Sequence, residues 1–230
     1  MIQFYFHSTP NAAKVALLLE EASLPCEAIP IDTNKGEQHA PGFRAINPNG
    51  KVPAVVDTEG PCGKQVRVFD STAILIYLAE KMNQFLGATT DDRPELLSWL
   101  LFIASGLGPF SGQAIYFQYA VPFFRLPEIN CPAAPAYRYR REAERHYKVL
   151  DDHLSDRDYI VGSNYTIADM SAWGWIDRAS KVLEGEDDAL APFPALKRWF
   201  SAIDGRPAVS RAREAKRALF PSNYPPSRPR

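Results

Sequence analysis

A change of residue pattern near position 85 leaves few folds open to this chain. Residues 2–6 are aromatic and β-prone, and a helix follows with apolar residues at i, i+3, i+4 and i+7 from Val15. Residues 26–31 read as a second strand. A strand–helix–strand unit of this length closes as a right-handed parallel crossover. The start of the chain therefore predicts two parallel strands with a helix packed on them.

Two more strands and a helix complete this region. The expected segments are, in order, a loop over 32–50, a strand over 51–57, a turn over 60–64, a returning strand over 65–69 and a helix that begins at Asp70-Ser71. Residues 1–84 thus predict an α/β layer with the order βαβ and then ββα.

Beyond residue 90 the pattern is helical throughout. Ala143, Tyr147, Leu150 and Leu154 fall on one stripe, and Thr166 with Asp169 forms a capping box at a helix start. We expect an all-helical domain over 90–220. Residues 206–230 carry 7 basic groups and 1 acidic group, and the proline-rich end predicts a flexible tail over 221–230, either solvated or anion-binding.

One stretch inside the helical region, residues 96–124, contains no charged residue. That length raises the possibility of a membrane span. Serine, glycine, glutamine and proline interrupt the stretch, so we expect a long buried helix with a kink near Gly108-Pro109. Such a helix also suits a subunit interface.

Composition excludes several classes of function. The formal net charge of −1 argues against nucleic-acid binding. The sequence contains no H-E-x-x-H pattern, which would have indicated a metal site. Cys26, Cys62 and Cys131 are scattered without a C-x-x-C pair, which argues against a disulfide scaffold and a two-cysteine redox enzyme. No partner is visible for the histidines. The chain opens directly on a strand, so we expect a cytoplasmic protein without a membrane partner.

Pro53 interrupts an otherwise regular strand pattern. Proline removes a ladder donor and belongs at sheet edges or special turns. In one interpretation the Val52-Pro53 bond is cis and turns the Val52 backbone outward, where it could pair with an extended peptide ligand. In the other, a trans proline lies at a sheet edge with no ligand. The pattern alone does not choose between them.

Polar residues at the first helix start suit an anion. Thr9 offers a hydroxyl and Asn11 an amide, and the helix dipole adds positive potential. A free thiol has a pKa near ~8.5, and lowering it by two units takes about 2.7 kcal/mol. One charge-assisted hydrogen bond contributes about 1.5–3 kcal/mol, so one donor and the dipole suffice to hold a thiolate. Alternatively, these residues only cap the helix.

A second helix start, Asp70-Ser71, pairs a carboxylate with a hydroxyl. Ser71 can cap the helix and leave amides free for a carboxylate, while Asp70 can receive an ammonium group. Together they match the two ends of an amino acid. The alternative is capping alone.

The chain resembles cytosolic glutathione transferases over roughly residues 1–215. The resemblance rests on three segments in order: NPNGKVPAV at 47–55, FDSTAILIYL at 69–78 and YTIAD at 165–169. It implies a thioredoxin-like domain over 1–84, which binds glutathione, followed by the all-helical domain of that family. It also implies a homodimer with glutathione as co-substrate and no metal.

Within that family the chain looks most like the nu class, or disulfide-bond oxidoreductases. TPN at 9–11, KGEQ at 35–38 and GLGP at 106–109, followed by GQ at 112–113, carry this closer match. The resemblance implies that glutathione or its disulfide occupies the cleft. Its contacts would be Asn11 and Thr9 at the sulfur, Val52 and Pro53 at the cysteinyl part, Asp70 and Ser71 at the γ-glutamyl end, and Gln38 and Arg138 elsewhere.

We therefore expect an enzyme in which bound glutathione thiolate reduces a small disulfide. Ser8 is the second choice for the sulfur contact, and Asp70 replaces the glutamate usual in the family with a shorter arm. Conjugation of glutathione to electrophiles, with Ser8 or Tyr116 more important, is one alternative. A non-catalytic regulatory module that binds glutathione is another.

Overall fold

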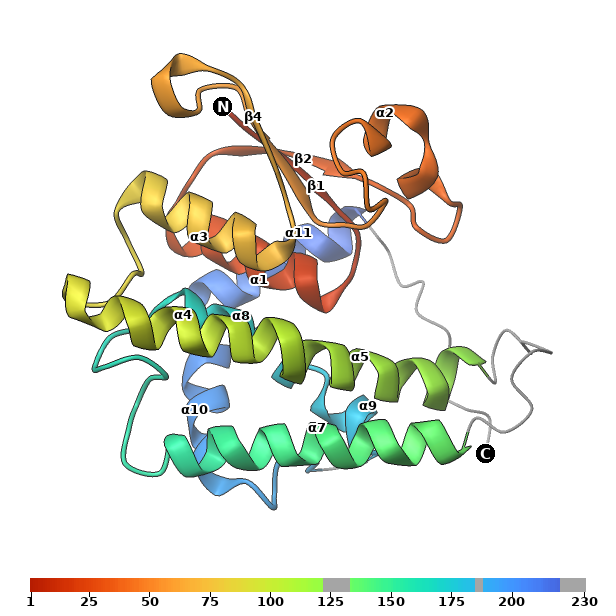
Figure 1. Cartoon of the computed structure of the whole chain (residues 1–230), viewed down its shortest axis with the longest axis vertical. Helices are drawn as coiled ribbons and strands as arrows, with labels where there is room; N and C mark the ends of the chain where they lie inside the picture. Colours follow the sequence, from red (N-terminus) through yellow and green to blue (C-terminus); the bar gives the residue numbers. More distant parts are fainter. Residues whose placement is uncertain (122–132, 185–187, 220–230) are drawn as a thin grey trace.

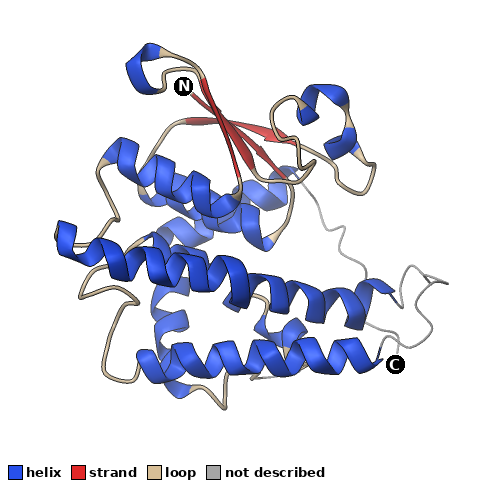
Figure 2. Cartoon of the chain, viewed as in Figure 1, coloured by secondary structure: helices blue, strands red, loops and turns tan. Residues whose placement is uncertain are grey.

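The computed structural model describes residues 1–121, 133–184 and 188–219, without the side chains of 215–219. A sheet with its helices forms one end of the molecule, and a helical bundle forms the other (Figures 1 and 2). Cys131 and the tail predicted over 221–230 lie outside the described residues.

The sheet has four strands in the described residues, in the order β2-β1-β3-β4. Their bounds are β1 Ile2–Phe6, β2 Cys26–Pro30, β3 Ala54–Asp57 and β4 Val66–Phe69. β1 and β2 are parallel, as the crossover predicted, and the other neighbouring pairs are antiparallel. β3 begins three residues later than expected, because Pro53 has no N–H to give to the ladder.

Helices of the amino-terminal part cover the sheet. Their bounds are α1 Pro10–Glu21, η1 Glu37–His39, α2 Pro41–Arg44, η2 Pro61–Gly63 and α3 Ser71–Met82. α1 and α3 pack together beneath the sheet and bury Val15, Leu18 and Ile74 completely. The loop expected over 32–50 was wrong in part, since η1 and α2 form short helical turns within it.

The carboxy-terminal part is helical, as predicted. Its elements are η3 Thr90–Asp92, α4 Arg93–Phe102, η4 Ile103–Leu107, α5 Gly108–Ile115, η5 Tyr116–Ala120, α7 Ala133–His153, α8 Ile167–Ile176, α9 Ala179–Val182, α10 Pro194–Asp204 and α11 Pro207–Leu219. The predicted stripe on α7 is fully buried. α5 packs along it, and α8 packs against α1 of the other part.

The uncharged stretch forms most of a helix that runs from Thr90 to Ala120. The helix continues through Gly108-Pro109, the place of the expected kink. Just before Pro109, η4 is a wider π-helical turn in which the Gly108 N–H donates to the Ile103 carbonyl. The helix is long and apolar enough to cross a membrane, with a mean hydropathy of 1.3, and in this structure it packs against α7 and α8.

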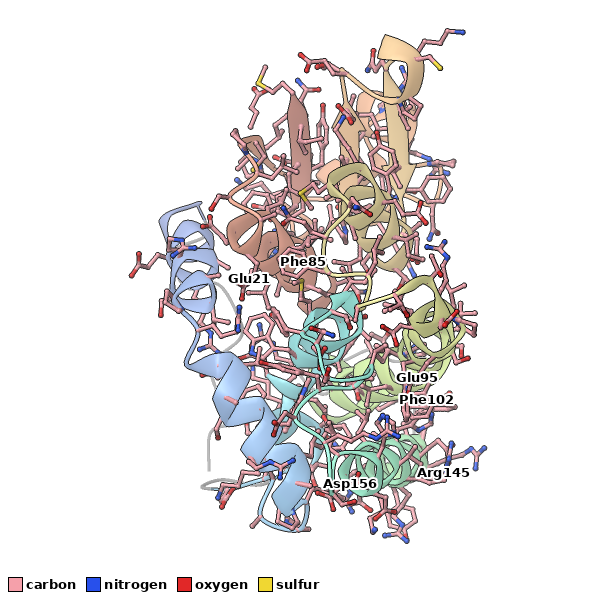
Figure 3. The ribbon with its side chains drawn as sticks, turned by 90° about the vertical axis from the view of Figure 1, so that its left-hand side faces the viewer. Glu21, Phe85, Glu95, Phe102, Arg145 and Asp156 are labelled. Carbon is pink, nitrogen blue, oxygen red and sulfur yellow. The ribbon has the colours of Figure 1, made fainter. Side chains whose placement is uncertain are left out.

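Polar contacts fix the start of α8 and join the two parts. Asp169 is fully buried and its carboxylate accepts four hydrogen bonds, one of them from the Thr166 N–H. That bond is one half of the predicted capping box, and in the other half the Thr166 side chain accepts from the backbone of Asp169. Arg206 donates to both carboxylate oxygens of Glu21, at 2.5 and 3.0 Å. Figure 3 shows Glu21 beside the blue carboxy-terminal helices. The domain interface is therefore tied by charge as well as packing.

The prediction that the histidines lack partners was wrong: His153 contacts the Ile160 carbonyl at 2.8 Å, and His146 has several partners. The ring of His146 is buried, its Nδ1 donates to the Glu142 carbonyl at 2.7 Å, and it stacks near Phe102 and Phe110. Gly106 lies so close that an added Cβ would meet the ring at 2.2 Å. His146 therefore serves the packing of α7 against the long helix.

Candidate functional site

Strand register brings the predicted site residues to one edge of the sheet. Phe6 pairs with Pro30, Tyr5 with Ala54, and Ala54 with Phe69. The ends of β1, β2 and β4 and the start of β3 therefore meet at that edge. The segments that enter or leave there carry Thr9 with Asn11, Val52 with Pro53, and Asp70 with Ser71. We call this group, together with Gln38, the cradle.

At the start of α1 the two predicted donors have different surroundings. Thr9 is the N-cap residue, and its Oγ1 accepts the Ala12 N–H at 3.2 Å, which leaves the hydroxyl hydrogen to donate. The side-chain amide of Asn11 makes no hydrogen bond to any described residue and is half-buried. Both donors lie at the positive end of the α1 dipole, which suits an anionic sulfur.

The Val52-Pro53 peptide bond is cis, as one of the two interpretations held. Val52 is half-buried, and its backbone N–H and C=O have no hydrogen-bonding partner among residues 1–121, 133–184 and 188–219. The preceding loop is held by Asn47, whose side chain donates to the Lys51 carbonyl at 2.5 Å and accepts from the Asn49 N–H at 3.0 Å. The loop thus presents one backbone donor and one acceptor to a ligand.

Gln38 lies against the same loop. A Cβ added at Gly50 would meet the Gln38 carbonyl at 3.3 Å, and Gly50 has a φ of +63°, so this close contact favours glycine. The Gln38 side-chain Nε2 lies 3.2 Å from Nε2 of His39. Its Oε1 is buried with no partner among the described residues.

Asp70, and not Ser71, is the N-cap of α3. Its Oδ1 accepts the N–H groups of Thr72 and Ala73 at 2.8 and 3.3 Å, and its φ is +71°. The prediction that Ser71 caps was therefore wrong, because Ser71 is already the first helical residue. Oδ2 of Asp70 is left to receive an ammonium group. Of the first three N–H groups of α3, that of Ser71 is the one not taken by Asp70, and it remains for a carboxylate.

Two predicted residues lie apart from the cradle. Arg138 is exposed on α7, in a shallow surface depression with Tyr137 and Arg141, and Figure 1 shows α7 beyond the long helix as seen from the sheet. Tyr116 is 39% exposed at the end of that helix and packs edge-on against Phe117. Their roles stay predictions.

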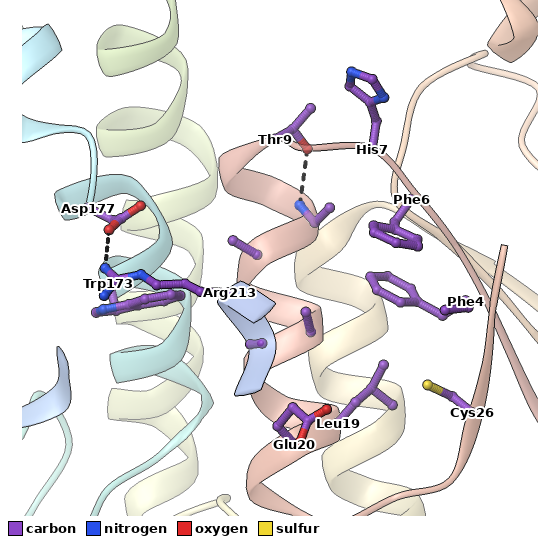
Figure 4. Close-up of a pocket in the computed structure, with 15 residues that line it drawn as sticks. Phe4, Phe6, His7, Thr9, Leu19, Glu20, Cys26, Trp173, Asp177 and Arg213 are labelled. Atoms are coloured by element: carbon purple, nitrogen blue, oxygen red, sulfur yellow. Dashed lines mark hydrogen bonds and ion pairs between the residues drawn. The ribbon is translucent and has the colours of Figure 1, made fainter. Parts of the chain in front are cut away.

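An apolar cavity of about 90 Å³ lies near the cradle but is distinct from it (Figure 4). Phe4, Phe6 and Leu19 line it, and Thr9 is the cradle residue that borders it. Cys26 also lines it. The residue is exposed overall, but partial burial of its thiol, together with the charge of Glu20, raises the pKa of that thiol. A raised pKa makes Cys26 a poor nucleophile at neutral pH.

Lys14, which the sequence patterns did not single out, is the buried cation nearest to this region. It is 1% exposed on α1, one turn beyond Asn11. Burial lowers its pKa to about 8, against the attraction of Asp70. A lysine within a helix usually lies on its solvated face. The position of Lys14 in the sequence therefore does not indicate that its side chain is buried. The part of the chain that the structure describes holds no cluster of three or more metal-ligating side chains.

Comparison with known proteins places both parts of the chain in one family. Residues 9–81 match the glutathione S-transferase N-terminal domain, and residues 134–202 match the C-terminal domain. The disulfide-bond oxidoreductase YfcG of Escherichia coli is 40% identical over 92% of this chain and 94% of its own length. A solved glutathione transferase family member from Pseudomonas fluorescens, with two glutathione molecules bound, is 38% identical, has a TM-score of 0.83, and aligns over 92% of this chain and 91% of that one.

A second solved structure adds the oxidised ligand. It is a glutathione transferase from Pseudomonas putida with one glutathione disulfide bound per subunit. It is 34% identical to this chain with a TM-score of 0.81, and the alignment covers 92% of this chain and 90% of that one.

Proposed function

Because the chain belongs to the glutathione transferase family, we propose that it binds glutathione in the cradle and uses its thiolate to reduce small disulfides. The observation that carries this proposal is the pair of backbone groups at Val52 without a partner among the described residues, at the same edge of the sheet as the free amide of Asn11. An extended peptide can pair with the Val52 backbone as an added strand would. In the proposal, the cysteine sulfur of that peptide then reaches the side-chain amide of Asn11.

The relatives support both the ligand and the reaction. Two E. coli relatives are named disulfide-bond oxidoreductases, and two solved relatives hold glutathione or glutathione disulfide. In our proposal, Asn11 and Thr9 stabilise the sulfur, Val52 pairs with the cysteinyl backbone, and Asp70 with Ser71 binds the γ-glutamyl end. Gln38 makes a further contact, and Arg138 contributes charge from the helical domain.

The proposed chemistry is two successive exchanges. The bound thiolate attacks one sulfur of the substrate disulfide, the S–S bond breaks, and the leaving thiolate takes a proton from water. A second glutathione thiolate then attacks the mixed disulfide, which yields glutathione disulfide and the second thiol. The protein supplies orientation and thiolate stabilisation, and no cysteine of its own takes part.

We further propose that the chain is a nu-class homodimer of the cytoplasm. From residue 96 onward the long helix carries no charged residue, and it exposes Leu101 at 60%, which suits an interface with a second copy. Cys26 and Cys62 are both free and exposed, as is usual for a reducing compartment. The TPN segment at 9–11 supports the class.

A crystal soaked with glutathione disulfide, together with parallel assays, tests the proposal. We expect one half of the ligand along Val52 with its sulfur at Asn11, and faster turnover of a dialkyl disulfide than of an aryl halide. Faster conjugation of the aryl halide would favour the transferase alternative. Binding with neither turnover would favour a regulatory module, and no binding would refute the proposal altogether.

A further inference from the structure

Lys14 is a buried charge for which the packing of the domain interface offers no carboxylate partner. Its one polar contact among the described residues is with Oγ of Ser171 on α8, at 3.5 Å from Nζ. A buried ammonium beside a single neutral hydroxyl is costly, and an apolar residue of the same length would pack there without that cost. The presence of a lysine at this position therefore calls for an electrostatic explanation.

The surroundings of Lys14 place its charge close to the N-terminal ends of the two cradle helices, α1 and α3. A Cβ added at Gly174 on α8 would meet the Pro10 carbonyl at 2.8 Å and Cγ of Lys14 at 3.0 Å. The lysine stem thus lies along α8 directly beside the first turn of α1. Side chains in a helix lean toward its N-terminus, which here is the Thr9 and Asn11 end.

Asp70 is the one charged group that acts on Lys14 from the neighbouring elements, among the described residues. α8 contributes Ser171 at the ammonium, and α3 contributes Asp70 at its N-cap. In the free protein the two opposite charges partly cancel. When the ammonium group of glutathione pairs with the Asp70 carboxylate, Asp70 no longer compensates the charge of Lys14, which lies in a water-poor interface. It then acts on the ligand's anionic groups.

We propose that Lys14 is a positioning residue whose buried positive charge favours the thiolate form of glutathione bound at Asn11. This inference rests on the proposed function. It concerns the ionised fraction of the bound glutathione thiol, and it does not depend on which reaction the thiolate then carries out. A unit charge held ~10 Å from a thiol lowers its pKa by about one unit at an effective dielectric constant of ~20.

The test replaces Lys14 with methionine, which keeps the unbranched stem and removes the charge. The matched control is Lys148→Met, which loses the same charge on an exposed face of α7. The measurement is the ultraviolet absorbance of the thiolate as the glutathione complex is titrated with base. We expect Lys14→Met to bind glutathione and to raise the thiol pKa by about one unit, from ~6.5 to ~7.5, with about threefold slower disulfide reduction at pH 7 and recovery near pH 9.

An unchanged thiol pKa in a folded Lys14→Met protein that binds glutathione would overturn the inference. The proposed function would survive that result, whereas no glutathione binding by the unmodified protein would refute the function itself. The control variant should keep both the thiol pKa and the rate.

If Lys14→Met does not fold, a measurement on the unmodified protein tests whether Lys14 stabilises the thiolate. By reciprocal linkage, a thiolate that is stabilised by Lys14 must in turn raise the pKa of Lys14. Nitrogen-15 NMR of the lysine side chain should therefore show Lys14 protonated to higher pH with glutathione bound than with S-methylglutathione, which has no thiolate. Equal titration in the two complexes would contradict the inference.

Discussion

Replacing Asn11 by alanine should raise the pKa of the bound glutathione thiol with little effect on folding. The amide of Asn11 makes no hydrogen bond to any described residue, and Thr9 keeps its capping bond to Ala12. Alanine is also the best helix former for the first turn of α1. We therefore expect the free energy of unfolding to change by less than about 0.5 kcal/mol.

The size of the effect on the thiol follows from the donor that is lost. A hydrogen bond to a charged group contributes about 1.5–3 kcal/mol, which corresponds to about one to two pKa units. The helix dipole and the Thr9 hydroxyl remain. From a bound-thiol pKa near ~6.5, the thiolate fraction at pH 7, and with it the rate of disulfide reduction, should fall about 3- to 25-fold.

The assay combines thiolate absorbance against pH with steady-state reduction of a dialkyl disulfide. Asn164→Ala, in an exposed turn of the helical part, is the matched control and should behave as the unmodified protein. An Asn11→Ala protein with an unchanged thiol pKa and rate would show that another group holds the sulfur. Ser8 would then be the next residue to replace.

Three further predictions concern folding and assembly. Asp169→Ala should lower the free energy of unfolding by about 3–5 kcal/mol, because four buried donors to this carboxylate lose their acceptor; denaturant unfolding checks this, and a loss below about 1 kcal/mol would contradict it. Lys14→Met should raise the free energy of unfolding by about 3 kcal/mol at pH 7, since the folded state holds a lysine with a pKa of about 8 against 10.5 in the unfolded chain. That gain should shrink from pH 8 to 10.5, where only the unfolded lysine stays protonated, and a gain that does not depend on pH would refute the cause. Leu101→Arg should convert a dimer to a monomer in light scattering, and an unchanged mass would place the interface elsewhere.

Local chemistry explains why much of the fold could be predicted from the sequence. The period-2 and period-3.6 patterns identified the strands and helices, and Thr166 with Asp169 marked the start of α8 as a capping box. At the place of the kink expected near Gly108-Pro109, the turn before Pro109 is the π-helical turn η4. A proline shows where an N–H is missing, but not whether the backbone will break or widen there.

The site was harder to predict, because its features depend on tertiary packing. Motif matches named the cradle residues, but the left-handed φ that makes Asp70 the cap is not visible in the order of residues. Lys14 follows the same spacing as a solvated lysine, and only the approach of α8 at Gly174 buries it. His146 gains its partners from the long helix in the same way.

Removing every cysteine of the protein tests most directly whether the sulfur that reacts belongs to bound glutathione. The variant Cys26→Ala, Cys62→Ala, Cys131→Ala should reduce a dialkyl disulfide with glutathione at a rate within about twofold of the unmodified protein, because only the ligand's thiolate attacks. A folded triple variant that still binds glutathione but has lost the activity would place the nucleophile in the protein and contradict the account.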